Sequence, residues 1–335
     1  MELDELIGAR LAVGLPGPDA TDEVLARLRE THAQSLVVFT RNFTSAAQIT
    51  ELLKRLERAL GRRLLVMVDH EGGRVIRFRE GVTRFPDART VGATQRPDAI
   101  ERQGAVEAAE LRRLGITVNL APCVDVVVEG SDPVIGDRSY GSDPERVAAC
   151  AAARIRGLQS HGVAACAKHF PGLGAVPRDP HATLPTIALD EPAMARTHLP
   201  PFQAAIQAGA AMVMSSHVCY PALGDPAGLP ATFSPRLIKG LLRERLGFSG
   251  LILTDDLEMG ALRTLGTMGE IAVRATEAGH DLLLICSDLS LVEEAFKALR
   301  KAYKENRLDT LELKKSGQRL AKLLKDMVMF QLGSR

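Results

Sequence analysis

The sequence predicts an α/β protein with eight parallel strands in a single (β/α)8 barrel of the TIM type. Eight short apolar runs alternate with amphipathic helical stretches, which is the pattern of a parallel sheet covered by helices. No Gly/Ser-rich linker or low-complexity segment divides the 335 residues. The eight runs are therefore expected to form one closed sheet, with an irregular strand or two. A doubly wound open sheet fits the same alternation and stays the alternative.

The expected strands are short apolar runs of the kind that is buried on both faces of a parallel sheet. They cover residues 10–15, 35–40, 64–69, 117–121, 162–168, 211–216, 251–255 and 280–286. The helical patterns that follow them cover residues 22–33, 46–60, 99–114, 144–160, 191–208, 235–246, 269–278 and 289–304. A final helix is expected at about 311–329, so the domain prediction is one catalytic barrel over residues 1–335.

Two of these helices have clear start signals. Asp143 precedes Pro144, and Ser234 precedes Pro235. A side chain that caps the first free N–H groups, followed by proline in the first turn, is typical of a helix N-terminus.

Composition excludes several classes of partner and cofactor. The 42 basic residues balance the 41 acidic ones, and no Lys/Arg run is dense enough to follow a nucleic-acid backbone. The five cysteines lie mostly in apolar runs without metal-ligand spacing, so we expect reduced core thiols, no metal and no cofactor. The sequence shows no signal-peptide pattern and no apolar stretch long enough for a bilayer. We therefore expect a cytoplasmic protein without a membrane partner.

Polar residues gather where the expected strands end. The segments are Thr40-Arg41-Asn42, Asp69-His70-Glu71-Gly72-Gly73-Arg74, Asp125, Lys168-His169, Ser215-Ser216-His217 and Thr254-Asp255-Asp256. Catalytic groups of such barrels lie at the carboxyl ends of the strands, and a buried charge is costly unless it is paired or binds a ligand. The sequence therefore predicts a functional site at this rim.

The segment after the fifth expected strand carries a proton-transfer pair. Glycines and prolines in residues 171–180 disfavour regular structure, and Asp179 stands two residues before His181. A carboxylate so placed can accept a hydrogen bond from one imidazole nitrogen and leave the other for a substrate.

These segments resemble single-domain β-N-acetylhexosaminidases of glycoside hydrolase family 3. The resemblance covers about residues 8–290 and rests on segments that keep their order along the chain. They are Leu36-Val37-Val38-Phe39-Thr40-Arg41-Asn42, residues 68–78, Ile135-Gly136-Asp137-Arg138-Ser139-Tyr140-Gly141, Lys168-His169-Phe170-Pro171-Gly172, Asp179-Pro180-His181, Met214-Ser215-Ser216-His217 and residues 254–259.

The resemblance implies a retaining glycosidase that removes terminal N-acetylglucosamine, commonly from peptidoglycan fragments during cell-wall recycling. It makes Asp255 the nucleophile, with His181 as acid/base and Asp179 orienting that histidine. It also implies sugar binding by a set of polar residues at the strand ends. These are Asp69, Arg77, Arg138, Lys168 and His169, with His217 as either a sugar contact or a buried histidine bonded to backbone. We expect Asp256 to be a structural carboxylate.

Two positions depart from the family pattern, which usually reads Pro-Gly-His-Gly and Asp-Ser-His. This chain has Leu173 and Pro180 there. Because proline fixes its own φ and restricts the residue before it, we expect a stiffer loop but an active enzyme.

Other functions remain open at this point. A lysine at a strand end, Lys168, would suit a Schiff-base aldolase, and His169, His181, His217 and Asp255 could serve a metal-dependent hydrolase. A non-catalytic sugar-binding barrel is a third possibility. An N-acetylglucosaminide phosphorylase or a β-glucosidase could use the same site, because a histidine acid/base would not repel phosphate as a carboxylate would.

Overall fold

The structure is a computed structural model, and it describes residues 2–177, 179 and 184–333. Eight parallel strands pair in chain order and form one closed barrel. They are β1 (Leu11–Gly14), β2 (Ser35–Val38), β3 (Leu65–Val68), β4 (Val118–Asn119), β5 (Ala164–Phe170), β6 (Met212–Ser215), β7 (Leu251–Asp256) and β8 (Leu282–Ile285). The (β/α)8 prediction is confirmed, and the open-sheet alternative is wrong.

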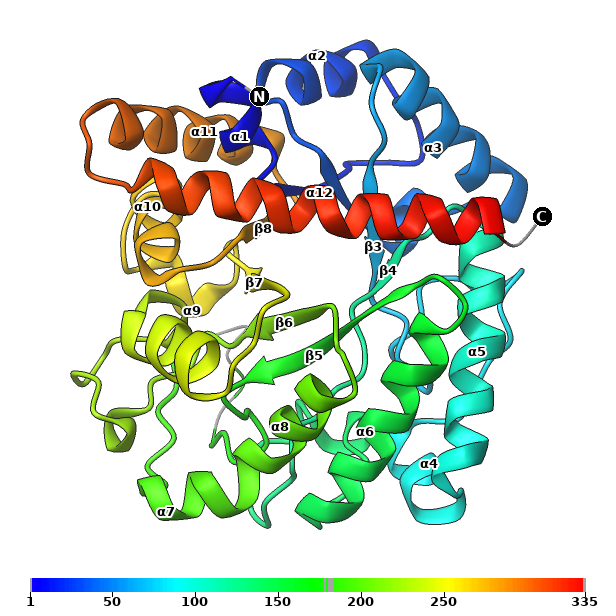
Figure 1. Cartoon of the computed structure of the whole chain (residues 1–335), viewed down its shortest axis with the longest axis vertical. Coiled ribbons are helices and arrows are strands. Elements are labelled where there is room, and N and C mark those ends of the chain that lie inside the picture. Colours follow the sequence, from blue (N-terminus) through cyan, green and yellow to red (C-terminus); the bar gives the residue numbers. More distant parts are fainter. Residues whose placement is uncertain (1, 178, 180–183, 334–335) are drawn as a thin grey trace.

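Helices surround the barrel, as Figure 1 shows. The main ones are α2 (Asp22–Glu30), α3 (Ala46–Leu60), α5 (Pro97–Arg113), α6 (Pro144–Gln159), α8 (Leu199–Gln207), the π-helix η6 (Arg236–Arg245), α10 (Met268–Ala278) and α11 (Leu289–Lys304). Short helices that the sequence analysis did not predict are α1 (Leu3–Gly8), α4 (Ala88–Thr94) and α9 (Gly260–Arg263). Each is too short to show a helical period in the sequence.

Both predicted helix starts have the expected cap. The Asp143 side chain accepts from the backbone N–H of Glu145 at 3.0 Å. The Ser234 hydroxyl accepts from the backbone N–H of Leu237, also at 3.0 Å. These oxygens satisfy N–H groups that have no partner inside their own helix.

The predicted helix over residues 191–208 is not regular. It divides into α7 (Glu191–Ala193), a π-helical turn η3 (Met194–His198) and α8. Pro200 and Pro201 lack the N–H groups that would continue an α-helical ladder back to Arg196 and Thr197, so the chain changes its hydrogen bonding there.

Strand β4 is shorter than predicted. It has two residues, and Pro122 follows soon after and contributes no N–H. Strand β5 still bonds to the segment after β4, because the backbone N–H of Cys166 donates to the Ala121 carbonyl at 2.9 Å. The barrel therefore stays closed beside an irregular fourth strand.

The core has two main layers. One apolar cluster joins strands to the surrounding helices, and another fills the barrel interior with side chains such as Val37, Met67, Cys166 and Leu253. Helix α12 (Thr310–Gly333) adds Leu320 to the interior cluster and covers the amino-terminal ends of the strands. The five cysteines are buried and free, and no helix among the described residues is long and apolar enough to cross a membrane.

Candidate active site

A cavity of about 470 Å³ opens at the carboxyl ends of the strands. Its polar lining comes from the loop after β3, the segment after β4, the last residues of β5 and β7, and the loop after β5: Asp69, Glu71, Arg74, Arg77, Arg138, Lys168, His169, Asp179, Asp255 and Asp256. Eight of the nine predicted site residues lie in the described chain, and seven of these, all but His217, line the cavity. His181 lies outside the described residues.

A second cavity, of about 720 Å³, lies at the opposite end of the barrel under α12. Its walls are largely Gly, Ala and apolar side chains, with Arg319, Lys322 and Asp326 contributed by α12. Lys322 and Asp326 pair with each other at 2.9 Å. We therefore place the candidate active site at the carboxyl end, where barrel enzymes bind their substrates.

A tight turn after β3 places two carboxylates in the cavity. Gly72 and Gly73 have φ values of +101° and +55°, which favour glycine. A Cβ on Gly73 would lie 2.5 Å from the Cβ of Asp87, so this position also has no room for a side chain. The turn brings Glu71 back beside Asp69, because Glu71 N donates to Val75 O at 2.8 Å.

Lys168 joins these two carboxylates. Its Nζ lies 2.7 Å from Asp69 Oδ1 and 2.7 Å from Glu71 Oε1, and its side chain is only 2% exposed. Burial alone would lower the pKa of Lys168, but Asp69 and Glu71 hold it above its usual value. The amine is therefore an ammonium with two of its three donors engaged inside the protein.

Arg138 also binds the Glu71 carboxylate. Its Nε and Nη2 donate to the two oxygens of Glu71 at 2.9 and 2.8 Å, which is a bidentate pair. Burial would raise the pKa of Glu71, but the charges of Arg138 and Lys168 bring it well below its usual range. Glu71 is thus an anion that holds two cations at the cavity wall.

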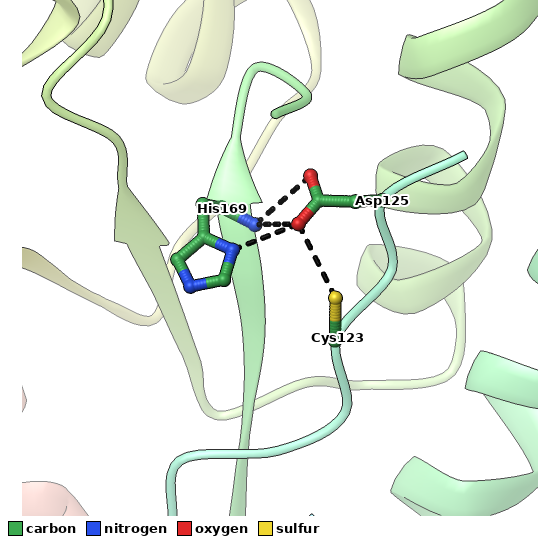
Figure 2. Close-up of side chains that lie close together, drawn as sticks. All are labelled: Cys123, Asp125 and His169. Carbon is green, nitrogen blue, oxygen red and sulfur yellow. Dashed lines mark hydrogen bonds and ion pairs between the residues drawn. The ribbon is translucent and has the colours of Figure 1, made fainter. Parts of the chain in front are cut away.

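Asp125 orients His169, as Figure 2 shows. Its Oδ2 lies 2.7 Å from His169 Nδ1, and its carboxylate also accepts from the backbone N–H groups of His169 and Leu173. Nδ1 therefore donates its hydrogen to Asp125, and Nε2 is on the cavity side, where Arg138 Nη2 lies 3.4 Å away. Asp125 is completely buried.

Cys123, Asp125 and His169 are also a possible metal-ligand set, because their ligand atoms lie within 4.8 Å of one another. The Cys123 thiol donates to Asp125 Oδ2 at 3.3 Å. Burial, followed by the charge of Asp125, raises the pKa of this thiol well above its usual value, whereas a metal would require the thiolate. A metal would also displace hydrogen bonds that already occupy the carboxylate. The contacts fit a group that positions His169.

Asp255 lies near the end of β7 and lines the cavity. Burial would raise the pKa of Asp255, but the nearby charges of His169 and His217 and a hydrogen bond from the backbone N–H of Asp256 lower it. Its neighbour behaves differently, because burial and the charges of Glu258 and Asp255 raise the pKa of Asp256 to about 7. The two adjacent carboxyl groups therefore have different ionisation, with Asp255 the anion.

Arg77 lies at the cavity wall against Asp69 and Phe39. Its Nη2 is 3.3 Å from Asp69 Oδ2, and its guanidinium lies 5.8 Å from the centre of the Phe39 ring. Its backbone N–H donates to Nδ1 of the buried His70 at 3.3 Å. Burial and the charges of Arg154 and Arg77 lower the pKa of His70 to about 4, so this ring is neutral and can accept.

His217 is buried, and both of its ring nitrogens contact protein groups. Its Nδ1 lies 2.6 Å from Thr232 Oγ1, and its Nε2 lies 2.9 Å from the Asp256 carbonyl oxygen. Of the two alternatives stated for His217, these contacts correspond to the buried histidine bonded to backbone.

Two functional side chains received no role from the sequence. Glu71 and Asp125 both stand in the strand-end segments, so their positions were visible. Their partners could not be read from the sequence, because Arg138 is 67 residues from Glu71 and His169 is 44 residues from Asp125.

Comparison with known proteins identifies the family. The model of the glycosyl hydrolase family 3 N-terminal domain matches residues 3–323. A beta-hexosaminidase of Thioalkalivibrio sulfidiphilus is 42% identical over 279 residues, which cover 82% of this chain and 79% of that protein.

Solved structures agree. A family 3 beta-N-acetylglucosaminidase from Paenibacillus sp. str. FPU-7 superposes with a TM-score of 0.95 at 36% identity over 98% of this chain, which spans only 63% of that longer protein. NagZ from Neisseria gonorrhoeae, in complex with N-trifluoroacetyl-D-glucosamine, superposes with a TM-score of 0.79 at 32% identity, and 96% of each chain is covered. The chain therefore belongs to glycoside hydrolase family 3.

Proposed function

We propose that this protein is a retaining β-N-acetylhexosaminidase that removes terminal, non-reducing β-linked N-acetylglucosamine. The observation that carries the proposal is Asp255, a carboxylate kept anionic at the end of β7 and facing a polar cavity. A retaining mechanism needs such a group to attack the anomeric carbon. The named relatives support the sugar, because they are beta-hexosaminidases and one binds an N-acylated glucosamine analogue.

In the first step, a carboxylate oxygen of Asp255 bonds to the anomeric carbon while the bond to the leaving oxygen breaks. A protonated His181 gives its proton to that oxygen. In the second step, water attacks the same carbon, neutral His181 takes the water proton, and the Asp255 carboxylate is released. Asp179 is assigned the orienting role, and its place in the cavity lining is consistent with it.

We assign sugar binding to side chains that are oriented by hydrogen bonds and ion pairs within the protein. Lys168 has one ammonium hydrogen left after its bonds to Asp69 and Glu71, and His169 presents Nε2. Arg138, Arg77 and Asp69 supply further donors and acceptors around the cavity. Because an unmatched polar group in such a site is costly, this lining selects a ligand rich in hydroxyl and amide groups.

The charge of Lys168 argues against a Schiff-base aldolase. A nucleophilic lysine needs a lowered pKa, whereas two carboxylates raise that of Lys168. His169 is committed to Asp125 through Nδ1 and His217 has protein partners for both ring nitrogens, which disfavours a metal-dependent hydrolase built on them.

We assign the physiological substrate to peptidoglycan fragments, processed in the cytoplasm as part of cell-wall recycling. This assignment rests on the family resemblance of the site segments. The test is to identify by mass spectrometry the products formed from a chitobiose-type and a muropeptide-type substrate, with and without phosphate.

Free N-acetylglucosamine released from the muropeptide substrate, with or without phosphate, is the expected product. N-acetylglucosamine 1-phosphate would instead identify a phosphorylase. Cleavage of a β-glucoside in preference to both substrates would identify a β-glucosidase, and no turnover on any substrate would contradict an enzymatic function.

A further inference from the structure

His217 links three elements beneath the nucleophile. It follows β6, its Nδ1 faces Thr232 in the short helix η5 (Ala231–Phe233), and its Nε2 faces the backbone carbonyl of Asp256 in β7. The residue is only 1% exposed. That carbonyl belongs to the Asp256–Leu257 peptide, so the ring anchors the backbone one residue after the nucleophile Asp255.

The hydrogen bonds around the ring determine its protons. A carbonyl oxygen can only accept, so His217 Nε2 must carry a hydrogen toward Asp256. The Thr232 hydroxyl has a single hydrogen, which it donates to the Ser216 carbonyl at 3.1 Å. Both contacts of Thr232 are satisfied together when its oxygen accepts from His217, which requires a hydrogen on Nδ1 as well. A ring that donates from both nitrogens is an imidazolium.

The charged and titratable groups around His217 are consistent with a cation. Asp255 and Asp256 lie on β7, and an imidazolium at His217 stabilises the Asp255 anion, in the direction of the lowered pKa of Asp255. Lys168 and His169 from β5 act on the same carboxylate. Among the described residues, His280, before β8, also lies near His217, and burial lowers the pKa of His280 to about 4, so it is neutral.

We infer that His217 is the positioning residue of the nucleophile, a buried imidazolium that fixes the backbone at the Asp256 carbonyl, next to Asp255, and supplies positive charge to this part of the site. The inference rests on the proposed function, since it assigns His217 a part in the reaction of that same site. It differs from direct sugar binding, because the ring acts on Asp255 and not on the substrate.

The protonation state can be measured directly. Protein labelled with ¹⁵N-histidine should show both ring nitrogens of His217 protonated between about pH 6 and pH 8, where an ordinary histidine loses its charge. The signal is assigned by its loss in His217→Gln, or by its shift in Thr232→Val if the first variant does not fold. His280 is the internal control, since Nδ1 bonds the Ala275 carbonyl and Nε2 bonds the Ser215 hydroxyl, an arrangement that a neutral ring satisfies. A bare ring nitrogen on His217 in this pH range would overturn the inference.

Kinetics test the positioning role. His217→Gln can still donate one N–H toward Asp256 but carries no charge, so we expect kcat to fall about 100-fold with KM little changed. Loss of the charge should raise the pKa of Asp255 and move the acid limb of the kcat/KM profile to higher pH. His280→Gln, another buried histidine replacement, should keep kcat and the acid limb of wild type.

Two results would overturn the positioning role. One is a rise in KM with kcat retained, which would indicate a sugar contact. The other is equal loss of kcat in both variants with the acid limb unmoved, which would indicate a merely structural histidine. Asp255→Asn separates this inference from the proposed function. If Asp255→Asn stays active, the function fails whatever His217 shows; if it is inactive and His217→Gln behaves like His280→Gln, only the inference fails.

Discussion

Replacing Glu71 with glutamine should cost both stability and substrate binding. The wild-type carboxylate is 4% exposed and accepts from Arg138 Nε at 2.9 Å, Arg138 Nη2 at 2.8 Å and Lys168 Nζ at 2.7 Å. Glutamine keeps the shape but presents an NH₂ group where an oxygen accepted. Arg138 and Lys168 then lose their shared buried anion. Lys168 keeps its ion pair with Asp69, and Arg138 keeps no ion pair among the described residues.

The expected loss of stability is about 3–5 kcal/mol, the usual cost of removing one partner from a buried ion pair. This is a large part of the roughly 5–15 kcal/mol that stabilises a typical domain, so the variant should fold but unfold at lower urea concentration. KM should rise because Lys168 and Arg138 are no longer held at the cavity wall. Glu101→Gln is the matched control, since its pair with Arg156 at 2.9 Å is exposed and should contribute under about 1 kcal/mol.

The pH dependence of this effect follows from the lowered pKa of Glu71. A carboxyl group whose folded pKa is below its unfolded value stabilises the fold above the unfolded value, and the contribution is lost as pH falls toward the folded one. The difference between wild type and Glu71→Gln should therefore be constant at neutral pH and shrink only below about pH 4.3. A difference no larger than that of Glu101→Gln, or one that disappears as pH rises, would refute this reasoning.

Three further variants test other parts of the site. The pKa of Asp256 is raised to about 7, so its burial as an anion costs stability at and above that pH and the cost disappears as pH falls toward about 4. Asp256→Asn should remove this pH dependence of the free energy of unfolding, measured by urea denaturation. An unchanged pH dependence would mean that the pKa of Asp256 is not raised in the folded protein. His198 is fully buried, and neither ring nitrogen has a hydrogen-bond partner among the described residues, so His198→Leu should raise the free energy of unfolding by about 1–3 kcal/mol, and destabilisation would contradict this. His181→Ala should slow an alkyl glycoside more than an activated aryl glycoside, because an acidic leaving phenol needs little protonation, and equal losses on both would contradict the acid/base role.

The sequence predicts the barrel well because its signals are local. Each strand is a short apolar run, and the caps at Asp143 and Ser234 are set by neighbouring residues. The irregular helix over residues 191–208 was not predicted, because its cause is a change in backbone hydrogen bonding. The helix over 191–208 changes its hydrogen bonding where two prolines remove N–H donors, although the apolar pattern continues through that point.

The site is predictable in its members but not in its connections. Strand-end position singles out Asp69, Lys168, His169 and Asp255, because barrel topology brings strand ends together. The pairing of Glu71 with Arg138 depends on the turn at Gly72 and Gly73, which returns the chain into the cavity. No spacing in the sequence encodes that contact. The same holds for His217, whose role depends on a carbonyl 39 residues away.

The central claim is that Asp255 forms a covalent bond to the sugar. A fluorinated N-acetylglucosaminide with a good leaving group slows the second step more than the first, so the glycosyl-enzyme should accumulate and raise the mass of the intact protein by one glycosyl group. Peptide mapping should place that group on Asp255, and Asp255→Asn should neither gain the mass nor turn over substrate while still binding N-acetylglucosamine. A label on another residue, or an Asp255→Asn variant with turnover within a few-fold of wild type, would contradict the account.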